Sequence, residues 1–304
     1  MIESLGDKSK FNSKDIEAIV ETCVFESIVT FGNFFDLLGI DSSLFTHLMD
    51  NRIIIDYTSE FGSAIACYLS NENGDNTIHI GAIYINNLLD ILKKNNNIVE
   101  YKNIIDEITA TIVHEVIHSN RDIYINNSIN LNNLMHYEEK FFNIHYTKLN
   151  KDFYGVSSDH LWSFNEDIST LSLDEIRKYR EKLIRQIGIE ESLTEAFANI
   201  MVFHKNKKEL KIKEFCNLML NSNLSDNLNA AFYLISNMSI NDIKWFYLSS
   251  YEDIYNDRFY TLFNKDYNRI ISYFYNFYIN EKKKPHQESK YDKCIKLIDK
   301  HLKK

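Results

Sequence analysis

The sequence predicts an α+β protein in which helices dominate and a small mixed sheet is confined to the N-terminal part. Only one of the 304 residues is proline, Pro285, and the last of the eight glycines is Gly188. Tight turns depend on Gly and Pro, so a protein built mainly of short strands is disfavoured. The β-branched and aromatic residues typical of strands cluster between 51 and 85. Helix is therefore the expectation for most of the remaining chain.

The first part of the chain is expected to contain one long helix and three strands. Apolar residues recur at intervals of three and four over 14–38, and Gly39 ends this helical pattern. Strands are predicted at 51–57, 63–70 and 77–85. The turn-forming sequence NENGDN joins the last two strands, which predicts a β-hairpin.

A second long helix is predicted at 99–120, after a short helix at 86–94. Its apolar residues cover most of its circumference, so we expect it to be central to the fold. These residues are Ile104, Ile105, Ile108, Ile112, Val113, Val116 and Ile117. A buried helix that also carries two histidines and a glutamate requires an explanation.

The rest of the chain divides into a connection and a helical region. Residues 121–170 lack a clear hydrophobic period and are expected to be irregular. Helical patterns return at about Ser172, are interrupted at Gly188, and continue from Glu190 to the C-terminus. We therefore predict three parts: an α+β lobe over 1–122, an irregular and partly helical connection over 123–188, and an all-helical lobe over 189–304.

Composition and charge restrict the classes of function. A net charge of −9 argues against a nucleic-acid-binding protein. The four cysteines form no CxxC pair, so neither a disulfide framework nor a cysteine zinc site is expected, which suits a reducing cytoplasm. The polar N-terminal segment lacks the pattern of a signal peptide, and no run of 18 apolar residues occurs. We therefore expect a cytoplasmic protein without integral membrane association, while delivery to another cell by a non-classical route stays open.

The C-terminal segment carries a local excess of positive charge. Residues 282–304 contain nine lysines against three acidic residues. A terminal helix over 290–304 would place Ile295, Ile298 and Leu302 on one face and lysines around the other. Such a helix either docks on the acidic body of its own chain, which we favour, or binds an acidic partner or a membrane surface.

Residues 114–118, HEVIH, form an HExxH motif inside the second long helix. Four residues make just over one helical turn, so His114 and His118 lie on one face with both imidazoles aimed at a common point, as two ligands of a tetrahedral zinc require. Glu115 lies about 100° around the helix from His114, where it reaches a metal-bound water rather than the metal. The pattern predicts a zinc site with Glu115 as general base.

A catalytic zinc requires a third protein ligand and an open position for water. In metzincins the third ligand follows closely, but Arg121 and Tyr124 stand where that pattern needs Gly and His. The sequence ESLTEAFA at 191–198 offers glutamates instead. Together, HEVIH and ESLTEAFA resemble the gluzincins, the clan of zinc peptidases that includes thermolysin-like and alanyl-aminopeptidase-like enzymes.

The resemblance covers about 30 residues and identifies no family within the clan. It implies a zincin-like catalytic unit with Glu191 as the third ligand and Glu195 as an acid hydrogen-bonded to a zinc histidine. Because Glu191 and Glu195 share a helix face, Glu195 remains the alternative ligand. The resemblance also implies that an extended peptide pairs with an edge strand, for which 77–85 is the candidate.

Gluzincins usually add a Tyr, His or Arg that stabilises the tetrahedral oxyanion. The sequence offers several such residues without choosing among them: His160, His204, Tyr255, Arg258, Tyr260, Tyr267, Arg269 and Tyr273. Arg121 and Asp122, directly after the motif, are candidates for contacts to the metal ligands.

The expected function is that of a Zn²⁺-dependent peptidase acting on a peptide or protein substrate, and a highly specific effector or toxin protease is one version of it. The alternative is a non-catalytic helical interaction protein, phage- or host-directed, with a structural or vestigial metal site. Metal content and hydrolysis separate the two.

Overall fold

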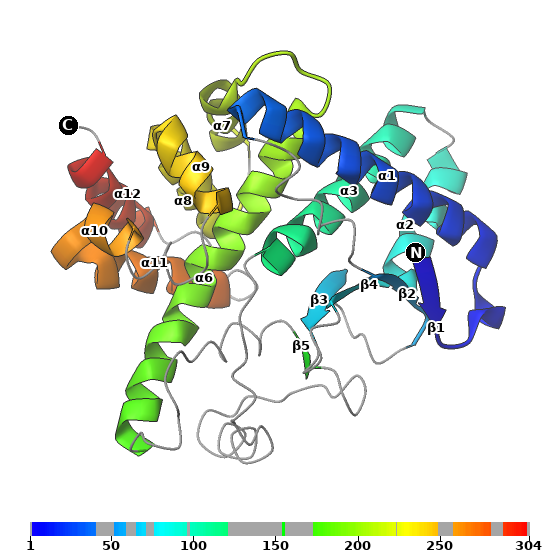
Figure 1. The fold of residues 1–304 in the computed structure, drawn as a ribbon, viewed down its shortest axis with the longest axis horizontal. Coiled ribbons are helices and arrows are strands. Elements are labelled where there is room, and N and C mark those ends of the chain that lie inside the picture. The colour runs from blue at the N-terminus through cyan, green and yellow to red at the C-terminus, as the bar shows by residue number, and fades with distance from the viewer. Residues whose placement is uncertain are drawn as a thin grey trace. The chain divides into compact units, whose positions relative to one another are not determined.

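The structure is a computed structural model, and Figure 1 shows its fold. It describes the chain except for residues 1, 41–51, 59–64, 71–75, 96–97, 121–153, 156–172, 223, 249–257, 281–287 and 303–304. Contacts divide the chain into two compact units. The first comprises Met1–Val29, Ser43–Ser119 and Ile123–Ser172, and the second comprises Thr30–Ser42, Asn120–Asp122 and Leu173–Lys304. Helix α1, Ser13–Leu38, contributes to both.

The first unit contains a five-stranded mixed sheet with the strand order β1-β2-β4-β3-β5. Strands β1, β2 and β4 are parallel, whereas β3 pairs antiparallel with both β4 and β5. The strands are β1 Ile2–Leu5, β2 Arg52–Asp56, β3 Ala66–Ser70, β4 Asn76–Gly81 and β5 Tyr154–Gly155. The predicted small mixed sheet and its β3–β4 hairpin pairing are confirmed.

One face of this sheet is apolar because residues paired across neighbouring strands point to the same side. Ile53 pairs with Ile78, Ile55 with Ile80, and Tyr68 with Ile78. All five side chains are buried. The period-two alternation of the strands thus accounts for this part of the core.

Three helices complete the described part of the first unit with the short 3₁₀ turn Lys8–Lys10. They are the first part of α1, then α2 Ala82–Asn95 and α3 Ile98–Asn120. All seven apolar residues of α3 that were predicted to cover its circumference are buried. The prediction that this helix is central is therefore confirmed. The Cys23 Sγ of α1 lies 3.8 Å from the Ile105 carbonyl oxygen of α3.

The described residues of the second unit form helices and their connections, with no strand. Its longest helix, α6, packs against α11 and α8, and α7 packs against α8. The helices are α6 Leu173–His204, α7 Ile212–Leu220, α8 Asp226–Asn237, α9 Ile240–Leu248, α10 Phe259–Phe263, α11 Tyr267–Asn280 and α12 Glu288–Leu302, with a 3₁₀ turn at Asn264–Asp266. Fully buried aromatic side chains form much of its core, including Phe197, Phe232, Phe246 and Phe274.

The terminal helix α12 docks on its own unit, as favoured from the sequence. Cys294, Leu297 and Ile298 are buried, and Lys300 and His301 both contact the carboxylate of the buried Asp266. Tyr233 of α8 also donates a hydrogen bond to Asp299 of α12. Docking therefore uses an apolar face together with specific polar contacts.

Two expected element limits and one expected strand position were wrong. No helix break occurs at Gly188, because α6 continues through it from Leu173 to His204. The strand predicted over 77–85 ends at Gly81, where α2 begins. That strand, β4, is also not an edge strand, because it pairs with β2 on one side and β3 on the other.

Helix α1 is long and apolar enough to cross a membrane by length and composition alone, with a mean hydropathy of 1.3 over its most apolar 18 residues. Nearly half of that window, 44%, is buried inside the protein. Core helices of soluble proteins and signal sequences meet the same criterion, so the absence of integral membrane association stays a prediction.

Candidate metal centre

The two histidines of the HExxH motif face one another on α3. The Nε2 atoms of His114 and His118 lie 2.9 Å apart. A tetrahedral zinc with bonds of about 2.0 to 2.1 Å would place two imidazole nitrogens about 3.3 Å apart. The observed separation is that of a hydrogen bond between the two rings, and it is a few tenths of an ångström shorter than the spacing that a shared zinc would need.

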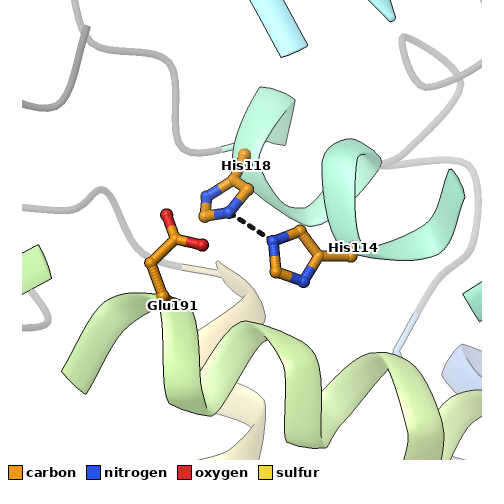
Figure 2. Close-up of side chains that lie close together, drawn as sticks. All are labelled: His114, His118 and Glu191. Carbon is orange, nitrogen blue, oxygen red and sulfur yellow. Dashed lines mark hydrogen bonds between the residues drawn. The ribbon is translucent and has the colours of Figure 1, made fainter. Parts of the chain in front are cut away.

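Glu191 of α6 is the third residue of a group that could hold a metal ion. One ligand atom from each of His114, His118 and Glu191 lies within 4.8 Å of the other two, which could hold one metal ion. Figure 2 shows the two rings and the carboxylate pointing toward one another. Two imidazoles and a carboxylate are a known catalytic zinc set with an open position left for water, so the donor chemistry fits zinc. His118 is buried, and His114 and Glu191 are half-buried.

Glu115 does not belong to this group of three residues, and its described hydrogen-bond partner lies on the sheet. Its Oε2 accepts a hydrogen bond of 2.9 Å from the backbone N–H of Tyr68 on β3. Glu115 is 7% exposed and Tyr68 is 5% exposed. The helix geometry that separates Glu115 from the two histidines thus directs it to the backbone of the sheet.

Glu195 lies one turn after Glu191 on α6. Its Oε1 and its backbone carbonyl both accept hydrogen bonds from Asn199 Nδ2, at 3.0 and 2.8 Å. The described contacts therefore tie its side chain to its own helix, and a bond to a histidine remains a prediction. The neighbouring Glu190 is fully buried, and its Oε1 accepts a hydrogen bond from Thr194.

Gly188 fixes the position of α6 in its unit. A Cβ atom at this residue would lie 2.5 Å from the backbone N and Cα of Tyr275 on α11. Only glycine allows the two backbones to approach so closely. The Gly188 carbonyl also accepts a hydrogen bond from Ser192 Oγ. This close contact lies three residues before Glu191.

Several residues considered as oxyanion stabilisers have internal partners. Arg258 pairs with Asp242, Arg269 pairs with Asp266, and the Tyr267 hydroxyl accepts a hydrogen bond from Gln186. His204 Nδ1 bonds to the Ile200 carbonyl, while its Nε2 accepts the Lys211 N–H. Both nitrogens are thus satisfied in one neutral tautomer, and burial lowers the pKa of this histidine. The described contacts of these four residues are all within the second unit.

The described contacts do not connect the remaining candidates to the cluster. Tyr260 is 55% exposed, and Tyr273 stacks on Phe277. Arg121, Asp122, His160 and Tyr255 lie outside the described residues. The oxyanion-stabilising residue therefore stays unassigned within the part of the chain that the structure describes.

No protein-family model, no curated protein and no solved structure matches this chain. The gluzincin resemblance therefore rests on the two motifs alone.

Three residues of the site region escaped the sequence reasoning. Tyr68 contributes through its backbone, which no side-chain pattern reports. Gly188 looked like a helix break, although it is a point of close helix packing. Asn199 could have been found, because it lies four residues after Glu195 and so on the same helix face.

Proposed function

We propose that this protein is a zinc-dependent peptidase that hydrolyses peptide bonds in a peptide or protein substrate. His114, His118 and Glu191 are the metal ligands of the proposed enzyme, Glu115 is its general base, and the catalytic unit is zincin-like. The observation that carries the proposal is that one possible ligand atom from each of His114, His118 and Glu191 lies within 4.8 Å of the other two, and that two of these residues belong to an HExxH motif.

Each residue has a defined task in this proposal. The histidines bind as neutral imidazoles, and Glu191 adds one negative charge to the site. Bound zinc would lower the pKa of its water and polarise the scissile carbonyl. Glu115 accepts the proton of the attacking water and delivers it to the leaving amine. Burial of Glu115 reduces competition from bulk water for its carboxylate.

The test is a peptide-library cleavage assay on purified protein with a measured zinc content. Wild type is compared with Glu115→Gln, which keeps the shape of the side chain but cannot accept the proton. Glu107→Gln is the matched control, because Glu107 lies exposed on the same helix and bonds to Tyr84. We expect Glu115→Gln to retain zinc and lose about 10² to 10⁴ in turnover, whereas Glu107→Gln keeps both.

Two outcomes would reject the proposal. Unchanged turnover in Glu115→Gln would remove the general-base role. The second outcome is that wild-type protein contains no zinc, cleaves no library peptide and binds a protein partner with high affinity. That result would favour the alternative of a non-catalytic interaction protein. Cleavage of one protein substrate but of no generic peptide would identify the specific effector version of the enzyme.

A further inference from the structure

The backbone N–H of Tyr68 points to the side of β3 that is opposite β4. Neighbouring residues of a strand direct their N–H and C=O groups to opposite sides. Ile65 directs its carbonyl to the N–H of Gly81 at the end of β4. Residues at odd positions of this strand therefore face β4, and Tyr68, at an even position, faces the opposite side. Its N–H meets Glu115 there.

This side of β3 is covered only in part by described strand pairing. The short β5 pairs Tyr154 with Ser70 and Gly155 with Leu69. Among the described residues, the ladder thus ends beside Leu69, and the next position along β3 is that of Tyr68. At this position a carboxylate, in place of a strand carbonyl, accepts the amide proton.

We propose that the Tyr68 backbone amide is the positioning group for Glu115. It holds one carboxylate oxygen, Oε2, and thereby orients the other oxygen and fixes the side-chain rotamer of the base. The catalytic part of this inference rests on the proposed peptidase function. The contact itself belongs to the first unit alone and can be tested without metal.

Physical chemistry supports a positioning role over a chance contact. A hydrogen bond from an N–H to a carboxylate is charge-assisted and stronger than a neutral one. Both residues are buried, so water competes poorly for either group. Tyr68 is also anchored on its other sides, because its side chain lies in the core and its strand pairs with β4. The donor is therefore a rigid reference point for the base.

The first experiment measures amide hydrogen exchange at single-residue resolution in metal-free protein. We expect the Tyr68 amide to exchange at least about tenfold faster in Glu115→Ala than in wild type. In Glu115→Gln the side-chain carbonyl still accepts the bond, so protection is retained. The amides of Cys67 and Leu69, which face β4, serve as controls in the same strand and keep their rates in both variants.

The second experiment replaces the Tyr68 amide by an ester through nonsense suppression with the α-hydroxy analogue of tyrosine. This substitution puts an oxygen in place of the N–H, weakens the preceding carbonyl as an acceptor, and leaves the side chain unchanged. We expect kcat for a library peptide to fall about 10- to 100-fold, while KM and zinc content stay unchanged. The same replacement at Leu69 is the matched control, because it removes an amide proton that faces β4. It lowers stability and leaves kcat near the wild-type value.

The outcomes separate this inference from the proposed function. Exchange at Tyr68 that does not respond to Glu115→Ala would overturn the contact. Equal kcat for the two ester variants would overturn the positioning role while leaving the peptidase intact. A third result is that hydrogen exchange of the Tyr68 amide depends on Glu115, but the protein neither binds zinc nor cleaves peptides. That result would reject the proposed peptidase function and leave the contact with a structural role only.

Discussion

The two helices that carry the proposed ligands are fixed in their units by different means. Helix α3 is apolar on nearly every side, and it meets the sheet backbone through the polar contact between Glu115 and Tyr68. Helix α6 has a fully buried polar run, Gln186, Glu190, Ser192 and Thr194, and approaches α11 closely at Gly188. A helix can thus be positioned by the packing of large side chains, as α3 is, or by a close backbone contact that only glycine allows, as α6 is. Mutations are expected to affect the two kinds of contact differently.

The largest effect is expected from removing one of the proposed ligands on α3. His118→Ala deletes a buried imidazole whose ring faces His114, so zinc affinity should fall by more than about 100-fold, beyond the usual cost of losing a group that only supports a ligand. Competition against a fluorescent zinc chelator measures the affinity. His79→Gln is the control, because His79 bonds to Asp56 and lies outside the cluster. Equal zinc affinities for the two variants would contradict the assignment of the α3 ligands.

The close packing of α6 at Gly188 predicts a smaller effect, on the free energy of unfolding. Gly188→Ala forces a methyl group against the backbone of Tyr275, which should cost about 1 to 3 kcal/mol in the free energy of unfolding. Gly32→Ala in α1 is the matched control, because the added methyl group would meet no atom within 4 Å apart from its chain neighbours and the nearby backbone of its own helix. That substitution should be neutral or stabilise by up to about 1 kcal/mol. Urea unfolding of both variants measures the difference, and equal stabilities would show that the close approach carries no energy.

The docking of α12 predicts a dependence on acid. Lys300, followed by His301, lowers the pKa of Asp266 from 3.8 to about 2. The depressed pKa in the folded state means that this carboxylate stabilises the fold above about pH 4, and that the contribution is lost as the pH falls toward 2. Asp266→Asn should therefore lower the Tm at pH 6 and converge with wild type near pH 2. Asp292→Asn, an exposed carboxylate of α12, should follow the wild-type profile at every pH.

Thiol reactivity gives the smallest contrast between the two units. Burial raises the pKa of Cys216 and of Cys294 to about 12, so neither thiol of the helical unit should react with a disulfide reagent at pH 8. Cys23 is fully buried, whereas Cys67, next to Tyr68 on β3, is partly exposed. We expect one labelled cysteine in the native protein, at Cys67. Labelling of Cys216 or Cys294 at a similar rate would show that the helical unit opens readily.

The sequence identifies features that repeat along the chain. The period of the apolar residues predicted α3 within one residue at its start and predicted its buried positions, because a central helix displays its environment in its own composition. The hairpin formed by β3 and β4 followed from alternation and a turn sequence. The His114 and His118 pairing followed from helix geometry alone.

Features that depend on distant partners could not be read in this way. The strand β1 is short and partly exposed, and it exists because β2 pairs with it 51 residues further along, at Ile2 and Ile53. Local propensity predicts a helix end at Gly188, because a glycine disfavours helix, whereas the reason for a glycine at this position is the close backbone of α11. The partner of Glu115 is a backbone amide, which is identical in every non-proline residue and leaves no signal in the sequence.

Zinc stoichiometry in Glu191→Gln and Glu195→Gln tests the central claim most directly. Both residues lie on the same face of α6 one turn apart, so each variant controls for the other. With stoichiometric zinc followed by dialysis, we expect about one zinc per chain in wild type and in Glu195→Gln, and a clear loss in Glu191→Gln. Wild-type protein without zinc, or loss confined to Glu195→Gln, would contradict the proposed centre of His114, His118 and Glu191.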